Sequence, residues 1–453
     1  MKGNQVWALI MLCVIGIQHN YSQNTSTFSL QQSIDYALQN NVNALNAQKD
    51  IEKSRHIVNE NIGLGLPQIS GNAQYNYNIE SPVFVFPNVM GPNPNPNEFI
   101  AINAAPLNNL SMSAVASMLI VNGQYFFGIQ AAKTYLEMTR NQKTKTSIEI
   151  KEQIIKSYYL VLIAEESSRV LDSSLKIINK TVYETGELWK EGLIEELDYE
   201  QMQLMQLSTQ NAYDQVMQSR ELALLSLKFQ MGYPLGNPIQ LSDNLDGLLT
   251  SSQFEGLAFS LSDSIDVRSN IDYTLISQKL KLNKQQYKLQ MSTFFPSLST
   301  FLQVGGNFFN NERWLFLGDG TTSTLNGVIW GLNLQVPVFS SWSRMSKLKQ
   351  AKVEIHKTQN QQRYVEQGLV LQYRNSKTQV IDNYKRYLTS KKSYELAEKI
   401  RRVNTIKYRE GLISSLNLSQ AEQQYFEHQQ KYFQAIFDLL NAKIQLDKSM
   451  NKF

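Results

Sequence analysis

Cysteine and histidine are nearly absent from this chain of 453 residues. The single cysteine is Cys13, and the four histidines, His19, His56, His356 and His428, are scattered without the spacing of a helical metal-binding pair. One thiol cannot form an intrachain disulfide or a thiolate metal site. Because no set of nucleophile, base and orienting group can be assembled either, we expect no catalytic residue, no metal site and no cofactor.

Charged side chains are also sparse. Asp, Glu, Lys and Arg make up 18% of the chain, against about 25% in ordinary domains. The formal net charge of +4 is spread thinly along the sequence. Because the sequence has no concentrated basic patch, it does not indicate nucleic-acid binding. Gln, Asn and Ser fill the polar positions instead, so we expect a hydrated but nearly neutral surface.

A long apolar run occurs only at the N-terminus, where residues 6–17 lie between a basic start and a polar stretch. This pattern is typical of a secretory signal peptide. The run is shorter than the roughly 20 residues of a membrane-spanning helix, and a retained anchor is the alternative. We predict that residues 1–23 are a signal peptide cleaved near Ser22 or Gln23, and that Cys13 leaves with it.

A duplication organises the rest of the chain. Trp189–Leu197 has the sequence WKEGLIEEL, and a similar sequence, YREGLISSL, follows at Tyr408–Leu416. Such a repeat fixes the architecture, because each copy must form the same supersecondary unit. We predict a first structural repeat at residues 24–232, a connector at 233–269 and a second repeat at 270–453.

Helices of unusual length dominate both repeats. The apolar stripes predict them at residues 124–190, 195–232, 341–409 and 414–450. A 60-residue helix extends roughly 90 Å, which is more than a compact domain needs. The stripes are narrow, so we expect coiled-coil packing. A further helix is predicted from Phe28 to about Leu64.

Alternation of apolar and polar residues predicts two strands in each repeat. They are expected at residues 68–79, 110–121, 297–309 and 324–338. The turns that lead into the first strand of each pair contain Pro67 and Pro296.

Two further expectations concern the surroundings of these strands. The six prolines between Ser81 and Pro106 predict an exposed loop, and residues 310–323 predict a second one. The last strand is expected to carry the apolar residues Leu325, Ile329, Leu332, Leu334, Val336 and Val338.

The strands have the length and the alternation of strands that cross a bilayer, with lipid on one face and water on the other. Four strands cannot close alone, because open sheet edges are not tolerated in hydrocarbon. Two chains would give about eight strands and a filled interior, whereas three would give about twelve and room for a channel. A soluble antiparallel sheet with helical hairpins is the alternative.

The order of these features resembles the TolC family of outer-membrane efflux proteins over essentially the whole mature length. The resemblance rests on the two proline-led strand pairs, the strand exits at residues 121–123 and 336–339, and the two Gly-Leu-Ile-x-x-Leu tips. It implies a mainly α chain with a small membrane β-sheet of four transmembrane strands. Three chains would form a 12-stranded barrel that continues into a periplasmic tunnel of coiled-coil helices.

The resemblance also implies function, location and partners. A homotrimer in the outer membrane of a Gram-negative bacterium would contact lipid and serve as a passive exit duct. It would belong to a tripartite efflux pump or a type I secretion system. A periplasmic adaptor would join it to an inner-membrane transporter, and the duct itself would perform no catalysis.

The two tips combine a helix stop with a restart, because glycine can adopt the positive φ that ends a helix. An ordinary hairpin turn explains the glycines but not the apolar side chains that follow them. We therefore expect adaptor docking at the tips, through Gly192, Leu193, Ile194, Leu197, Gly411, Leu412, Ile413 and Leu416.

The resemblance further implies a gate at the periplasmic end, closed at rest. Asp198 occupies the family's acidic position and Tyr408 its tyrosine position, so a link between them is expected. Asn417 and Gln420 stand where some members carry pore-narrowing aspartates, and amides would narrow a pore without selecting cations. Ile413 stands at the family's basic lock position, which departs from the pattern.

Two other classes of function remain as rivals. An exported coiled-coil scaffold or filament would use the helices as its working surface and the sheet as an oligomer clamp. Strands that prefer detergent to water would argue against it. An enzyme is the third possibility, but the chain lacks a recognisable set of reacting groups.

Overall fold

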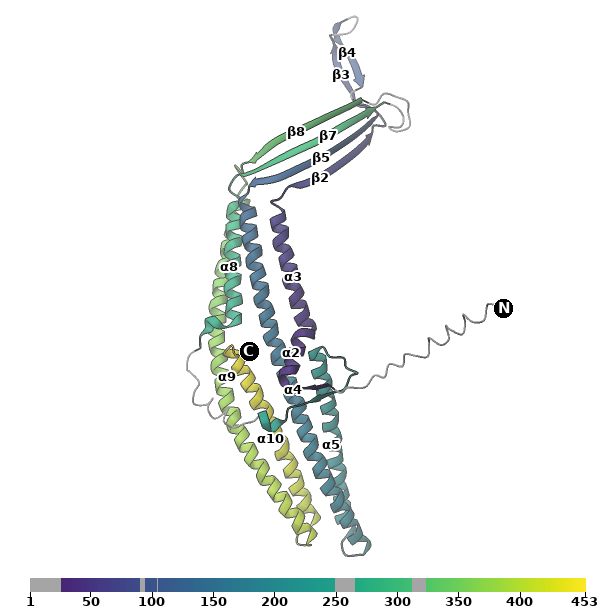
Figure 1. The fold of residues 1–453 in the computed structure, drawn as a ribbon, viewed down its shortest axis with the longest axis vertical. Coiled ribbons are helices and arrows are strands. Elements are labelled where there is room, and N and C mark those ends of the chain that lie inside the picture. Colours follow the sequence, from purple (N-terminus) through teal and green to yellow (C-terminus); the bar gives the residue numbers. More distant parts are fainter. Residues whose placement is uncertain (1–25, 90–93, 104, 249–264, 312–322) are drawn as a thin grey trace, which may run out of the picture. The chain divides into compact units, whose positions relative to one another are not determined.

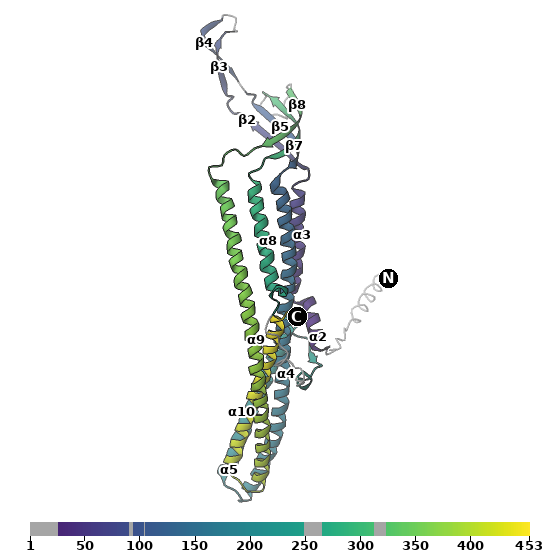
Figure 2. The same cartoon turned by 90° about the vertical axis from the view of Figure 1, so that its left-hand side faces the viewer.

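The computed structural model describes residues 26–89, 94–103, 105–248, 265–311 and 323–453, and the predicted signal peptide lies outside these residues. The chain divides into two compact units, and both repeats contribute to each. Unit 1 consists of Met1–Lys49, Asn141–Thr274 and Tyr364–Phe453, and unit 2 of Asp50–Arg140 and Leu275–Arg363. Figures 1 and 2 label the elements.

Long helices account for most of the chain. The four longest are α4 (Gly123–Lys190), α5 (Glu196–Met231), α9 (Ser343–Arg409) and α10 (Ser415–Ser449). With 68 residues, α4 extends about 100 Å at 1.5 Å per residue. The starts and ends of all four lie close to those that the apolar stripes predict. None of the described helices combines the length and the hydropathy of a transmembrane helix.

The start of the chain differs from the single helix predicted between Phe28 and Leu64. Phe28 ends a short strand, β1 (Ser26–Phe28), which pairs in parallel with β6 (Ile239–Leu241). Two helices follow, α2 (Leu30–Asn40) and α3 (Val42–Gly63). They separate at Asn41, whose side chain accepts from the backbone of Asn43 and donates to the backbone of Gln230. Asparagine competes for backbone hydrogen bonds in this way and so interrupts helices.

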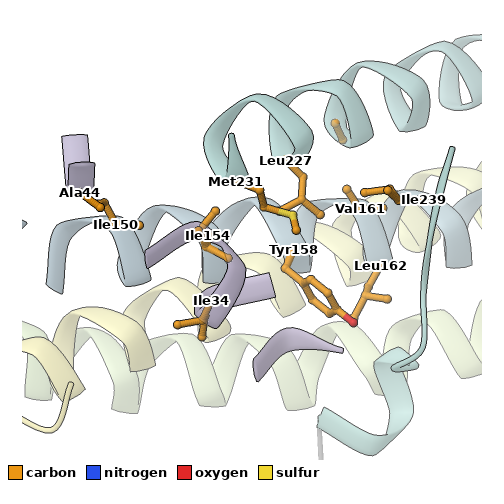
Figure 3. Close-up of a cluster of buried hydrophobic side chains, with 12 residues drawn as sticks. Ile34, Ala44, Ile150, Ile154, Tyr158, Val161, Leu162, Leu227, Met231 and Ile239 are labelled. Carbon is orange, nitrogen blue, oxygen red and sulfur yellow. The ribbon is translucent and has the colours of Figure 1, made fainter. Parts of the chain in front are cut away.

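A buried cluster of unit 1 surrounds Tyr158 on α4 (Figure 3). Ile154 and Leu227 are fully buried beside it. The Tyr158 hydroxyl lies 3.0 Å from the carbonyl oxygen of Phe28 and 3.0 Å from a carboxylate oxygen of Asp243. These contacts fasten the described part of the predicted connector, which includes β6 and α6 (Leu245–Leu248), to the helices.

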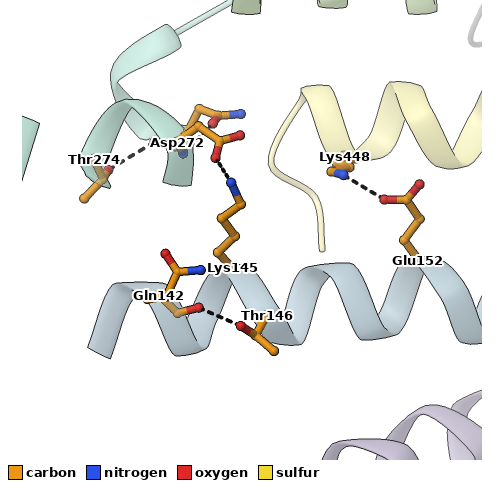
Figure 4. Close-up of polar contacts among 8 residues, drawn as sticks. Gln142, Lys145, Thr146, Glu152, Asp272, Thr274 and Lys448 are labelled. Atoms are coloured by element: carbon orange, nitrogen blue, oxygen red, sulfur yellow. Dashed lines mark hydrogen bonds and ion pairs between the residues drawn. The ribbon is translucent and has the colours of Figure 1, made fainter. Parts of the chain in front are cut away.

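Ion pairs fasten other parts of unit 1 to α4 (Figure 4). Lys145 pairs with Asp272 at 2.7 Å, near the start of α8 (Ile271–Ser292), which the 3₁₀ turn η1 (Val267–Ser269) precedes. Lys448 of α10 pairs with Glu152 at 2.7 Å. Burial alone raises the pKa of Glu152, but hydrogen bonds from Lys156, Lys448 and Gln445 outweigh it and lower the pKa to about 2. The end of α10 therefore lies against a carboxylate that stays charged.

Unit 2 contains a four-stranded antiparallel sheet in the order β2-β5-β7-β8. The strands are β2 (Gln68–Tyr77), β5 (Asn108–Val121), β7 (Ser297–Asn310) and β8 (Ser323–Gln335). Pro67 directly precedes β2 and Pro296 directly precedes β7. The strands contain no Asp, Glu, Lys or Arg. The sheet therefore contains no charged side chain that would need contact with water.

The register places most of the apolar positions of the four strands on one face. Ile69, Ala116, Leu302 and Trp330 lie opposite one another from strand to strand, as partners in an antiparallel ladder do. On one chain this face is uncovered: Ile69 is 80% exposed and Trp330 is 69% exposed. The other face carries mostly Ser, Asn, Gln and Gly, including Ser70, Asn72, Gln74, Ser111, Ser113, Ser117, Gln303 and Asn307.

The apolar residues predicted in the last strand lie on both faces of the sheet. Leu325 pairs with Asn307 and Ile329 pairs with Gln303, so both lie on the mostly polar face. Residues of odd and even number cannot share a face in a regular strand. The apolar face of β8 instead consists of Val328, Trp330, Leu332 and Leu334, while Val336 and Val338 follow the end of the strand.

The proline-rich segment predicted as a loop is largely a β-hairpin. β3 (Val83–Asn88) pairs with β4 (Asn95–Asn103), and Phe84 lies opposite Ile102. Pro82 stands before β3, and Pro87 lies where the register shifts. Proline is tolerated at such ends and irregularities, so the β-forming residues between the prolines still pair. Most of the second predicted loop lies outside the described residues.

Candidate functional site

The first helical hairpin consists of α4 and α5, and the second of α9 and α10. Both end in the same backbone motif. Gly192 has φ of 71° and Gly411 has φ of 70°, in the left-handed region that favours glycine. The N–H of Leu193 donates to the carbonyl of Leu188 at 2.9 Å, and the corresponding bond from Leu412 to Lys407 is also 2.9 Å. In each tip this hydrogen bond closes a turn of six residues and satisfies a carbonyl group left free at the helix end. The duplicated sequence therefore produces two copies of one tip.

The apolar residues of the tips divide into two kinds. Leu193 is 66% exposed and Leu412 is 71% exposed, and Leu197 and Leu416 are exposed as well. Ile194 and Ile413 are half-buried. In a single chain the leucines thus form the uncovered part of each tip.

Tyr408 links the second hairpin to the first, but not through the predicted partner. Its hydroxyl lies 3.2 Å from the hydroxyl of Thr185 on α4. Burial raises the pKa of Tyr408, the bond with Thr185 opposes this, and the nearby charge of Asp198 raises it further. The predicted direct hydrogen bond between Asp198 and Tyr408 is not formed, although the two side chains are close enough to interact electrostatically.

Asp198 makes a separate link across the two hairpins. The buried hydroxyl of Ser415, at the start of α10, contacts the carboxylate of Asp198 and the side-chain oxygen of Gln201, both on α5. A hydroxyl that donates to a carboxylate forms a charge-assisted hydrogen bond, which is stronger than a neutral one. Asp198, at the predicted acidic position, therefore contacts the second hairpin, but its partner is Ser415 rather than Tyr408.

A third link joins Arg409 to Glu184, whose nitrogen and oxygen atoms are 3.1 Å apart. Both side chains are more than a third exposed, so the pair contributes at most about 1 kcal/mol. Sequence reasoning missed Thr185, Ser415 and Glu184. Each lies within eight residues of a tip glycine, but only the packing of α4 against α9, and of α5 against α10, identifies the partners.

Asn417 and Gln420 are exposed on the first turns of α10. The backbone N–H of Asn417 donates to the hydroxyl of Ser414, which caps the helix. The amide side chains are therefore presented outward rather than used in the links between the hairpins. Among the described residues, no three His, Cys, Asp or Glu side chains are grouped as metal ligands would be.

A small apolar cluster lies beneath the links. Ile178, Met202 and Leu418 are buried there, with Tyr408 and Tyr199 packed against them. Helices from both hairpins contribute to the cluster, so apolar contact and polar links act together to hold the hairpins to each other.

A sheet that exposes one largely apolar face and one polar face is the pattern of transmembrane β-strands. Residues 276–452 match the family model of the outer membrane efflux proteins. This match over the second repeat agrees with the resemblance to TolC proteins that the sequence shows. No curated protein sequence matches the chain.

Solved structures have the same fold along nearly the whole chain. CusC, described for its transmembrane channel formation, has a TM-score of 0.71 at 15% identity, and the match covers 96% of this chain and 95% of CusC. VceC, an outer-membrane protein of Vibrio cholerae, gives 0.67 at 15% identity, with 93% and 95% covered. The open MtrE outer-membrane channel of Neisseria gonorrhoeae gives 0.68 at 17% identity, with 93% and 88% covered.

The link between Tyr408 and Thr185 predicts a local effect on stability. Tyr408→Phe removes one hydrogen bond between the hairpins and should lower the local stability of the C-terminal end of α9 by about 0.5–1.5 kcal/mol. Hydrogen exchange of the backbone amides near residue 408 measures the change. The matched control is Tyr364→Phe, which alters an exposed tyrosine on the same helix. Equal exchange in both variants would contradict a role for the hydroxyl.

Proposed function

We propose that three copies of this chain close their sheets into one barrel of about twelve strands, which serves as a passive exit duct for a tripartite efflux pump or a type I secretion system. A periplasmic adaptor would connect the duct to an inner-membrane transporter. The helices would continue the barrel as a periplasmic tunnel whose entrance is closed at rest.

The open edges of the sheet are the observation that carries this proposal. β2 and β8 are the outer strands of the four-stranded sheet, and each has a neighbour on one side only. The exposed apolar face suits lipid, where unpaired backbone groups are not tolerated. Strands from other copies satisfy these edges. Two copies would leave an interior filled by side chains, whereas three leave room for a passage.

The two faces of the sheet support the same arrangement. The face with Val328, Trp330 and Leu332 would contact lipid. The face with Ser70, Asn72 and Gln74 would then line a water-filled lumen. Such alternation between lipid and water is the pattern of transmembrane β-barrels.

The links near the tips support a closed entrance. Opening requires the second hairpin, α9–α10, to move relative to the first, α4–α5. Such a movement must break the bond from Tyr408 to Thr185 and the bond from Ser415 to Asp198. With Asn417 and Gln420 at the narrowing, amides rather than carboxylates would line the passage, so discrimination among small cations would be weak.

Removing both links should open the entrance. The variant Asp198→Ala with Tyr408→Phe loses one charge-assisted and one neutral hydrogen bond, together worth about 2–4 kcal/mol per chain when shielded from water. We expect a higher single-channel conductance in a planar bilayer, with the trimer intact. If the parent conducts and the variant conducts equally, the gate lies elsewhere. If neither the parent nor the variant conducts, the channel function is contradicted.

The exposed leucines at the tips suit docking of the adaptor. Leu193 and Leu412 are the most exposed apolar residues of the two tips and follow the two glycines. Apolar side chains grouped at the ends of otherwise polar hairpins indicate an interaction surface. The duplication gives every chain two such tips, so a trimer would offer six.

Substitution of the tip leucines tests this docking. Leu193→Ser with Leu412→Ser should weaken binding of the adaptor at least tenfold, because the loss of about 1.4 kcal/mol already gives that factor. The control changes the preceding exposed acidic residues, Glu191→Ser with Glu410→Ser. Export and adaptor co-purification are the measurements, with trimer melting unchanged. Normal export in the leucine variant would exclude the tips as the docking surface.

A further inference from the structure

Arg401, on α9, is a largely buried arginine that contacts both hairpins. Its side chain is 12% exposed. A guanidinium nitrogen donates to the hydroxyl of Ser174 on α4 at 2.9 Å, which crosses from the second hairpin to the first. The guanidinium carbon also lies 4.1 Å from the centre of the Tyr425 ring, on α10. Ser174 and Tyr425 are themselves almost completely buried, at 1% exposure each.

The counter-charge of Arg401 is Glu422, also on α10. The closest nitrogen and oxygen atoms are 3.8 Å apart, and the Glu422 side chain is 3% exposed. Its oxygen Oε2 is buried without a hydrogen-bond partner. A buried carboxylate held only by a long ion pair is costly to keep charged. Burial accordingly raises the pKa of Glu422 to about 7, although Arg401 acts in the opposite direction.

The contacts of Arg401 differ in what they join. Glu422 and Tyr425 belong to its own hairpin, and the Tyr425 hydroxyl is in turn 3.2 Å from that of Tyr394 on α9. These groups hold the guanidinium in place within α9–α10. Among the described contacts of Arg401, Ser174 is the one that lies on α4. The hydrogen bond to Ser174 is therefore the part that breaks when the second hairpin leaves the first.

We propose that Arg401 is a positioning residue of the entrance gate, which fastens the second hairpin to α4 through Ser174, and that protonation of Glu422 makes this fastening depend on pH. The assignment rests on the proposed channel function. Arg401 would then be the basic residue of the gate, because the position of Ile413 carries no basic side chain.

The direction of the pH dependence follows from where Glu422 is buried. In the closed arrangement its pKa is about 7, whereas a carboxyl hydrated by opening returns towards about 4.3. The closed state therefore binds the proton more tightly. Its advantage is complete below the pKa of the hydrated group and is lost as the pH rises through about 7. Opening should become easier between about pH 5 and pH 8.

Other ionisable groups near this site do not share that range. Tyr394 and Tyr425 have pKa values raised by burial, above their ordinary value near 10. Glu398, exposed on α9, acts on both tyrosines. Arg401 is the charged group that acts on Glu422 itself, and α4 presents the uncharged hydroxyl of Ser174.

The test uses the full mature trimer in planar bilayers, with conductance recorded from pH 5 to pH 8. Ser174→Ala should raise the open fraction at pH 6 about fivefold, the change in an equilibrium that one ordinary hydrogen bond makes. Arg401→Met should raise it at least as much. The matched control is Arg402→Met, which removes the same charge from the exposed neighbour on α9. Glu422→Gln should flatten the pH profile, because an amide does not titrate.

Ser174→Ala keeps the test decisive if Arg401→Met fails to assemble, because it removes only one hydroxyl. If the parent conducts and Ser174→Ala conducts identically at every pH, the fastening role of Arg401 is overturned while the channel stands. A Glu422→Gln variant that keeps the parent's pH profile overturns the role of Glu422. If neither the parent nor any variant conducts, the channel function falls, and this assignment falls with it.

Discussion

Backbone groups at the two edges of the sheet impose the strictest requirement on this protein. β2 and β8 each leave one row of N–H and C=O groups without a partner in the sheet of a single chain. Each such group costs several kcal/mol in hydrocarbon, yet the exposed apolar face with Ile69 and Trp330 is stable only in contact with apolar material. Both demands are met when further copies continue the sheet. In the proposed trimer, the helical hairpins of three chains would surround one passage, and contacts between hairpins would control it.

Duplication supplied two hairpins of one design, and their differences lie where one hairpin contacts the other. Trp189 and Tyr408 occupy the same position in the repeated segment. Trp189 stacks on Tyr199 within its own hairpin, with ring centres 5.2 Å apart and planes 9° from parallel. Tyr408 instead reaches Thr185 on the other hairpin. Trp189 therefore packs within its own hairpin, whereas Tyr408 connects the second hairpin to the first.

Patterns of short range were predictable from sequence, whereas pairings across the fold were not. Period and proline positions placed the long helices and the four strands of the sheet, and the tip glycines have the positive φ expected of them. The β3–β4 hairpin was missed because its prolines outweighed the run from Val83 to Phe86. The apolar residues of β8 did not by themselves define its apolar face, because Leu325 and Ile329 fall out of phase with Trp330. The partners of Asp198 and Tyr408 depend on how α4, α5, α9 and α10 pack, which no local pattern encodes.

Disulfide cross-linking between the edge strands tests closure of the sheet by three chains most directly. Apart from Cys13, in the predicted signal peptide, the chain has no cysteine, so introduced thiols are the only reactive pair. Every variant carries one cysteine in place of Asn333 in β8. The second cysteine replaces a residue of β2, a different one in each variant, between Gln68 and Asn76. If three chains close the sheet, one position in β2 should yield a covalent species of three chains and none larger. Products that stop at two chains, extend beyond three, or fail to form at every position would contradict a trimeric barrel.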